Sequence, residues 1–263
     1  MNTTRVITRK TSADFARMKV AGRCVAAMHA AVRAAIAPGV TTRELDEIAR
    51  GVLVEHGCTS SFLGYGGPQH PFPGVLCTSP NSVIVHGIPD DTKLREGDII
   101  SIDAGAIYEG WHGDAAFTAA VGDVSDEVAN LLEVTERALW SGIAAAKAGN
   151  RLGDIGAAVE GEALPHGLGV VREYVGHGIG RQMHEAPSVP NYGRAGKGLR
   201  LKKGMALAIE PMFNLGTPES HVLDDHWTVV TADGAWSAHF EHTVLFTDEG
   251  TVVSTVPEPV VVA

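Results

Sequence analysis

The chain has 263 residues and a formal net charge of −10, and 44% of its residues are hydrophobic. This hydrophobic content is enough for a large core, whereas an acidic chain without a basic patch is not expected to bind nucleic acid. Cys24, Cys58 and Cys77 are too few and too widely spaced for a disulfide framework or a Cys-x-x-Cys zinc module, so they favour a reducing compartment. No apolar run approaches the roughly 18 residues of a membrane-spanning helix. We therefore expect a cytoplasmic protein without nucleic-acid or membrane partners.

The first part of the chain predicts two consecutive helices. Apolar residues recur at alternating three- and four-residue steps after Ser12, which we interpret as the N-cap of a helix that ends at Pro38-Gly39. Thr41-Thr42-Arg43-Glu44 then has the form of a capping box. It opens a second helix that stops near Gly57.

The same order of elements returns later in the chain. Ser125 is the expected N-cap of a third helix that ends near Gly149, and a weaker fourth helix runs from about Asp154 into Glu162. When the chain is shifted by 110 residues, several glycines and acidic residues of the two helix pairs coincide. This offset favours an internal duplication. Two unrelated helix pairs that have glycines at similar positions would also produce it.

Three segments have the composition of strands. Residues 98–107 alternate in polarity and are followed by a two-residue hairpin turn at 109–110, while residues 205–213 and 239–247 are apolar, β-branched or aromatic. Helices and strands do not alternate singly, which argues against a parallel α/β sheet. We predict an α+β fold with an antiparallel sheet and helices on its outer face.

The predicted hairpin places two carboxylates on one face of the sheet. With a turn at 109–110, Gly105 lies opposite Asp114 and Asp103 lies opposite Ala116. Opposed residues share a face, as do residues two apart on one strand. Asp103 and Asp114 are then diagonal neighbours, with Cα atoms roughly 7–8 Å apart. A three-residue turn would move one of them to the other face.

Three further side chains are potential metal ligands. His177 lies between two glycines, and Glu210 and Glu241 lie within or at the head of apolar strands. A carboxylate in such a place is rarely buried unless it is paired or bound to metal; an ion pair is the alternative for both glutamates. Together with the two aspartates, these residues suit a pair of divalent ions rather than a thiolate zinc site. Two ions about 3.5–4 Å apart can activate water, so the pattern predicts hydrolysis.

Two more histidines, His86 and His184, lie in short segments that contain proline. Each is either a surface loop residue or a hydrogen-bond donor to a substrate carbonyl and to a tetrahedral intermediate.

The chain resembles a type 1 methionine aminopeptidase from about residue 12 to about residue 254. The motifs that carry the resemblance are His-Gly-Ile-Pro-Asp-Asp at 86–91, Gly-Asp-Ile-Ile-Ser-Ile-Asp at 97–103, Trp-His-Gly-Asp-Ala-Ala at 111–116, Arg-Glu-Tyr-Val-Gly-His-Gly-Ile-Gly-Arg at 172–181, Ala-Ile-Glu-Pro-Met at 208–212 and Glu-His-Thr at 241–243. The resemblance implies the pita-bread fold, in which two pseudo-symmetric halves enclose antiparallel sheet with helices outside. We expect a single catalytic domain over 1–263, with halves at about 12–123 and 124–254.

The resemblance also assigns a role to each potential ligand. Asp103 would chelate one ion and His177 the other; Asp114 and Glu241 would bridge them, and Glu210 would complete the set and transfer protons. A water or hydroxide activated by the two ions (Co, Mn, Fe or Zn) would attack the carbonyl after the first residue. The implied activity is removal of the initiator methionine from nascent proteins and peptides by a monomeric enzyme.

Substrate contacts follow from the same resemblance. His86 and His184 would contact the peptide and steady the intermediate. The methionine pocket would be lined by Phe62, Tyr65, Cys77, Met183 and Trp227. A secondary site for a monovalent cation would be formed by Asn81, the carbonyl of Val83 and Ser237.

Departures from the family pattern lie around this pocket. Met183 stands where phenylalanine is usual, and Phe62 where a smaller residue is often found. Residues 66–74 form a longer, more proline-rich link than usual, and we expect its Phe72 and His70 to cap the substrate entrance. A prolidase or Xaa-Pro aminopeptidase on the same fold, and a catalytically silent peptide-binding homologue, are the alternative functions.

Overall fold

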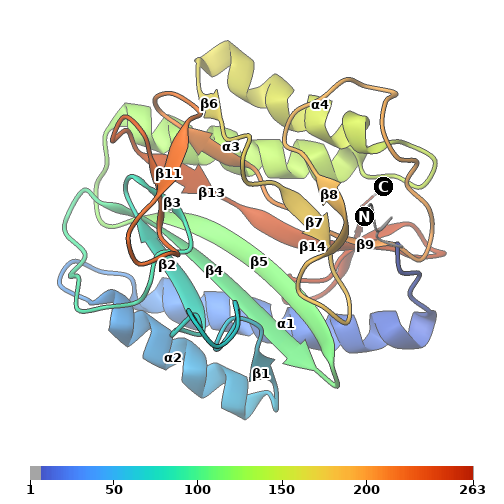
Figure 1. Cartoon of the computed structure of the whole chain (residues 1–263), viewed down its shortest axis with the longest axis horizontal. Helices are drawn as coiled ribbons and strands as arrows, with labels where there is room; N and C mark the ends of the chain where they lie inside the picture. The colour runs from blue at the N-terminus through green and yellow to red at the C-terminus, as the bar shows by residue number, and fades with distance from the viewer. Residues whose placement is uncertain (1–6, 263) are drawn as a thin grey trace.

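The computed structural model describes residues 7–262, and in this range ten strands form one antiparallel sheet that four α-helices cover (Figure 1). Helices α1 and α2 lie along one half of this sheet, and α3 and α4 lie along the other (Figure 1). The predicted α+β architecture is therefore confirmed. No helix within residues 7–262 combines the length and the apolar character required to cross a membrane.

The helices are α1 (Ser12–Ala35), α2 (Thr42–Glu55), α3 (Asp126–Ala145) and α4 (Leu152–Ala163), which a 3-10 turn η1 (Leu164–His166) extends. The large sheet consists of β1 (Thr59–Ser60), β2 (Leu76–Pro80), β4 (Ile99–Tyr108), β5 (Trp111–Ala120), β7 (Gly176–Gly178), β8 (Glu185–Val189), β9 (Ala206–Ile209), β14 (Glu241–Phe246), β15 (Thr251–Val253) and β16 (Val260–Val262). Two three-stranded sheets accompany it, one of β6 (Gly169–Val170), β10 (Met212–Asn214) and β13 (Ser237–His239), the other of β3 (Val83–Val85), β11 (Ser220–Val222) and β12 (Val229–Thr231).

The starts of the first two helices follow from their capping boxes. In α2, Thr41 and Glu44 exchange side-chain and backbone hydrogen bonds as predicted. The predicted N-cap of α1 was wrong by one residue: Thr11 caps the helix, because its hydroxyl accepts the backbone N–H of Asp14 while the Asp14 carboxylate accepts that of Thr11. Ser12 is therefore the first helical residue.

The second helix pair also differs from the prediction at its ends. Ser125 caps α3 as expected, but the helix ends at Ala145 rather than near Gly149. The side-chain amide of Asn150 donates to the Ala145 carbonyl and so satisfies one of the free carbonyls at that end. Helix α4 starts at Leu152, two residues before the predicted Asp154.

The hairpin of β4 and β5 has the predicted two-residue turn. Glu109 and Gly110 have φ of 48° and 78°, and Tyr108 pairs with Trp111. Two central residues with positive φ match the right-handed twist of the flanking strands. As a result, the predicted register holds along both strands.

The segments at 205–213 and 239–247 are each two strands rather than one. The first breaks at Glu210 and Pro211, so that β9 stays in the large sheet while β10 joins β6 and β13. Proline has no N–H for the ladder, which explains why the chain leaves the sheet there. The second breaks at Phe240, whose N–H donates to the Pro211 carbonyl. The two breaks thus lie side by side and open a space in the sheet.

Helix α1 packs closely against the sheet because small residues face each other. Gly22 lies against the backbone of Gly113 on β5, and a Cβ at Gly22 would overlap the carbonyl oxygen of Ser254. Met18 and Met28 on the same helix are completely buried. This contact fixes the back of the strand that carries Asp114.

Candidate metal centre and substrate pocket

A cavity of about 270 Å³ opens where β4, β5, β7, β9 and β14 meet. All of the predicted metal ligands line it, and so do the predicted substrate residues. The metal-ligand candidates are Asp103, Asp114, His177, Glu210 and Glu241. The candidate substrate residues are His86, His184, Phe62, Tyr65, Cys77, Met183 and Trp227. Residues from distant parts of the sequence therefore converge on one pocket.

Three carboxylates are positioned by one row of strand pairings. Asp103 on β4 pairs with Ala116 on β5, and Ala116 pairs with Glu241 on β14. Residues paired in this way share a face, and the small Ala116 side chain leaves the space between the two acids free. Asp114 lies two residues from Ala116 on the same strand and the same face, as the predicted hairpin requires.

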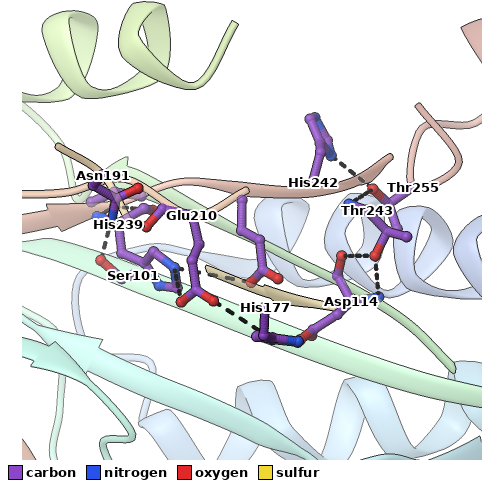
Figure 2. Close-up of polar contacts among 11 residues, drawn as sticks. Ser101, Asp114, His177, Asn191, Glu210, His239, His242, Thr243 and Thr255 are labelled. Carbon is purple, nitrogen blue, oxygen red and sulfur yellow. Dashed lines mark hydrogen bonds and ion pairs between the residues drawn. The ribbon is translucent and has the colours of Figure 1, made fainter. Parts of the chain in front are cut away.

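His177 faces two of these acids from β7. Its Nε2 lies 3.7 Å from Asp114 Oδ2 and 3.6 Å from Glu210 Oε1. Its Nδ1 lies 2.9 Å from the Gly178 carbonyl oxygen, which can only accept, so Nδ1 carries the proton. Nε2 then presents its lone pair to the carboxylates, the orientation typical of a metal-binding histidine. Figure 2 shows Glu210 reaching from the break after β9 toward His177.

Buried carboxylate oxygens in this cavity have no hydrogen-bond partner within the described residues. They are Oδ1 of Asp103, Oδ1 of Asp114 and Oε1 of Glu241. Among the described residues that line the cavity there is no lysine or arginine. Several carboxylates in such a place need a compensating cation, because an unpaired buried charge is costly.

The pKa values of these acids reflect their burial. Burial, and secondarily the neighbouring carboxylates, raises the pKa values of Asp114, Glu210 and Glu241 well above their usual range. Burial raises the pKa of Asp103 to about 7. Divalent ions would reverse these shifts, since a cation favours the charged carboxylates. The donor set, its unpartnered oxygens and its raised pKa values all fit bound divalent metal.

Two further imidazoles lie beside the metal-ligand candidates, and the first is that of His184. The Tyr65 hydroxyl lies 2.6 Å from Nδ1 of His184, and the His184 ring lies 4.2 Å from the His177 ring, centre to centre. His86 packs edge-on against the rings of Tyr174 and Trp227. Two imidazoles therefore border the cavity next to the carboxylates.

An apolar cluster closes the other side of the cavity. Phe62, Phe72, Cys77 and Met183 pack together there, with Trp227 against them. Phe72 belongs to the 66–74 segment and lines the cavity, whereas His70, the other residue expected at the entrance, does not line it. The exposed His70 of the same segment contributes its backbone carbonyl, which accepts the indole N–H of Trp227 at 3.1 Å.

The residues of the expected monovalent-cation site lie near one another. The Ser237 backbone N–H donates to the Asn81 carbonyl at 2.9 Å, and Val83 follows two residues after Asn81. The Asn81 amide is engaged elsewhere: it donates to Asp98 and accepts from the backbone of Ile99. Only main-chain oxygens of Asn81 and Val83 and the Ser237 hydroxyl are therefore available to a cation.

Five residues that line this cavity were not predicted from the sequence: Val85, Glu173, Tyr174, Val175 and His239. His239 had a readable signal: it lies two residues before Glu241, and residues two apart in extended chain point to the same side. Tyr174 lies within the 172–181 motif but in a loop before β7, where no periodicity indicates which way a side chain points.

The chain matches the family model of metallopeptidase family M24 over residues 16–248. It is 48% identical to methionine aminopeptidase 1 of Bacillus subtilis over 92% of this chain and 96% of that protein. It is 49% identical to methionine aminopeptidase 1 of Mycobacterium tuberculosis over 94% of each chain. Among solved structures, methionine aminopeptidase from Thermotoga maritima superposes with a TM-score of 0.92 and 41% identity, covering 95% of this chain and all of that one.

Proposed function

The chain belongs to metallopeptidase family M24 and has the pita-bread fold, and from this membership we propose that it removes the N-terminal methionine from peptides and nascent proteins. The proposal rests on one observation, namely that a set of potential metal ligands and an apolar cluster lie in the same cavity. Buried carboxylates and His177 form a metal-binding wall, and an apolar cluster of aromatic and sulfur-containing side chains forms the wall beside it. The first suits hydrolysis, and the second suits a methionine side chain.

We propose that two divalent ions bind here, held by the five predicted ligands. Asp103 would hold one ion and His177 the other, with Asp114 and Glu241 between them and Glu210 completing the set. An oxygen-rich set with imidazole accepts Mn, Fe, Co or Zn. When bound, the ions would lower the pKa of water and polarise the scissile carbonyl.

The protein's own side chains would position the peptide and move protons. The carboxylates attract the cationic amino terminus, while the apolar cluster encloses the first side chain. His184, oriented by Tyr65, and His86 can donate hydrogen bonds to the carbonyl oxygen as negative charge develops on it. The Glu210 carboxylate can take up a proton and deliver it to the leaving amine.

Methionine release from Met-Ala-Ser tests the proposal. We expect activity after chelation and addition of Mn²⁺ or Co²⁺, and no cleavage of Ala-Pro or Gly-Pro peptides. Cleavage before proline with no release of methionine would favour the prolidase-like alternative. No cleavage together with no metal binding would favour a silent peptide-binding protein.

Variants of the ligands test the site itself. Asp114→Asn and Glu241→Gln should lower kcat/KM by at least about 100-fold, because each removes a negative charge from the metal-binding wall. Both amides are close in size to the acids, so far-UV circular dichroism should remain that of the parent. Full activity in either variant would contradict the site assignment.

The remaining expectations stay as proposals of the same kind. We propose a monovalent cation on the oxygens of Asn81, Val83 and Ser237, which K⁺-dependent thermal stability would support. We also propose a monomeric, cytoplasmic enzyme, and the three buried cysteines with free thiols support the reducing compartment. Light scattering in solution measures the oligomeric state directly.

A further inference from the structure

We propose that His239 is a sixth metal-ligating side chain of this centre, beside the five that the family resemblance assigns. The inference deepens the proposed function and rests on it in one respect, namely that the cavity binds divalent ions. It follows from the position of one imidazole nitrogen, Nε2, which has no partner within the described residues although the side chain is only 2% exposed.

Two hydrogen bonds hold the main chain of His239 against strand β5. Its N–H donates to the Thr118 hydroxyl at 2.9 Å, and its carbonyl accepts from the same hydroxyl at 2.8 Å. Thr118 lies on β5, the strand that carries Asp114, and His239 pairs with Met212 on β10. The imidazole therefore projects from a main chain that these hydrogen bonds hold in place, next to the strand breaks at Pro211 and Phe240.

From this position the imidazole faces two of the carboxylates. Nε2 lies 3.7 Å from Glu210 Oε2 and 4.0 Å from Glu241 Oε2. Both separations exceed the range of 2.7–3.2 Å in which an N–H···O hydrogen bond forms. Neither acid is thus a hydrogen-bond partner for this nitrogen, and the described residues offer it no other.

The same separations suit donors that share an ion. Two donors that are each about 2.0–2.2 Å from one ion lie no more than about 4.4 Å apart. His177 meets this condition with Asp114 and Glu210 at 3.7 and 3.6 Å, and His239 meets it with Glu210 and Glu241. Single donor atoms of Glu210, His239 and Glu241 all lie within 4.8 Å of one another, as do those of Asp114, His177 and Glu241.

Glu210 is then shared between two imidazoles. Its Oε1 faces His177 and its Oε2 faces His239, and Figure 2 shows the carboxylate between the two rings. Adding a second imidazole to four carboxylates shifts the donor set toward nitrogen, which favours Fe²⁺, Co²⁺ and Zn²⁺ over Mn²⁺. We therefore expect tighter binding of one ion, and stronger discrimination against Mn²⁺, than His177 alone would provide.

Proton NMR of the Co²⁺-loaded protein tests the ligand assignment directly, without a peptide substrate. Each Co²⁺-bound imidazole contributes one paramagnetically shifted ring N–H signal that disappears in D₂O. Two such signals are expected for the parent and one for His239→Gln, while calorimetry with Co²⁺ should show at least about tenfold weaker binding of one ion. His242→Gln is the matched control, because this half-buried histidine, three residues later on β14, lies 2.9 Å through its Nδ1 from the Thr255 hydroxyl. It should keep both signals.

Each other outcome has a defined meaning. A single shifted signal in the parent, or two in His239→Gln, overturns the assignment. Weaker Co²⁺ binding with an unchanged number of signals also overturns it, since His239 would then only position Glu210. If His239→Gln fails to fold by circular dichroism, the count in the parent still decides. Two signals in a protein that releases no methionine would refute the proposed function while leaving this inference intact.

Discussion

Replacing Lys10 with methionine should destabilise the protein and disturb the segment that carries His184. Lys10 Nζ lies 2.8 Å from Glu185 Oε2, and the two side chains are only 2% and 8% exposed. The other Glu185 oxygen accepts the backbone N–H groups of Arg181 and Gln182. The ion pair thus anchors residues 181–185 to the N-terminal segment.

The expected magnitude follows from the geometry. At 2.8 Å and an effective dielectric constant of about 20, the two charges attract by about 6 kcal/mol. Desolvation of both groups offsets most of this gain in the folded protein. Removing only Lys10 leaves an uncompensated buried carboxylate, which typically costs about 3–5 kcal/mol. Because Glu185 keeps its backbone donors, we expect a loss near the lower end, about 3 kcal/mol.

Urea denaturation of three variants measures this effect. Lys10→Met should lower the unfolding free energy by about 3 kcal/mol, and adding Glu185→Gln should recover part of the loss, since the lone charge is then gone. Lys203→Met is the matched control: its pair with Asp248 at 3.0 Å is exposed, so it should cost less than about 1 kcal/mol. Equal losses for the two lysine variants would refute the reasoning.

Three further predictions concern other parts of the chain. Burial lowers the folded-state pKa of His29 to about 3, so the unfolded state binds a proton first and stability falls as pH drops from about 6.5 toward 3. His29→Gln should remove about 1.4 kcal/mol per pH unit from that slope in denaturant titrations, and an unchanged slope would contradict it. Shortening the loop at 68–71 should broaden the accepted second residue in a peptide-library cleavage assay; an unaltered profile would show that the loop does not restrict it. Gly22→Ala should lose about 1–3 kcal/mol or more in thermal unfolding because its Cβ overlaps the Ser254 carbonyl, whereas Gly51→Ala, with open space around it in α2, should gain about 0.5–1 kcal/mol.

Local chemistry made much of this fold predictable. The capping box at Thr41 and the turn at 109–110 depend on neighbouring residues alone, so sequence patterns located them correctly. From that turn, the register that brings Asp103 and Asp114 to one face follows by counting. Strand composition could not reveal that the chain changes sheets at Pro211 and Phe240, because each break depends on a partner far away in the sequence.

The site was predictable to a similar degree and for similar reasons. Glu210 and Glu241 stood out as acids in apolar surroundings, a contrast visible in the sequence itself. His239 stood out less, because a single histidine is more often structural; its position two residues before Glu241 was the one signal, and its distances to Glu210 and Glu241 distinguish it. The anchoring of His184 through Lys10 joins residues more than 170 positions apart, and no sequence spacing encodes it.

The row of pairings from Asp103 through Ala116 to Glu241 has a consequence for assembly. Strands β5 and β14 are neighbours in the sheet but come from different halves of the chain, with the helices α3 and α4 between them in sequence. A polypeptide truncated after β5 would possess two acids and no imidazole donor from β7. Ion capture therefore requires the docking of β14 onto β5, so metal uptake reports this long-range contact rather than helix formation.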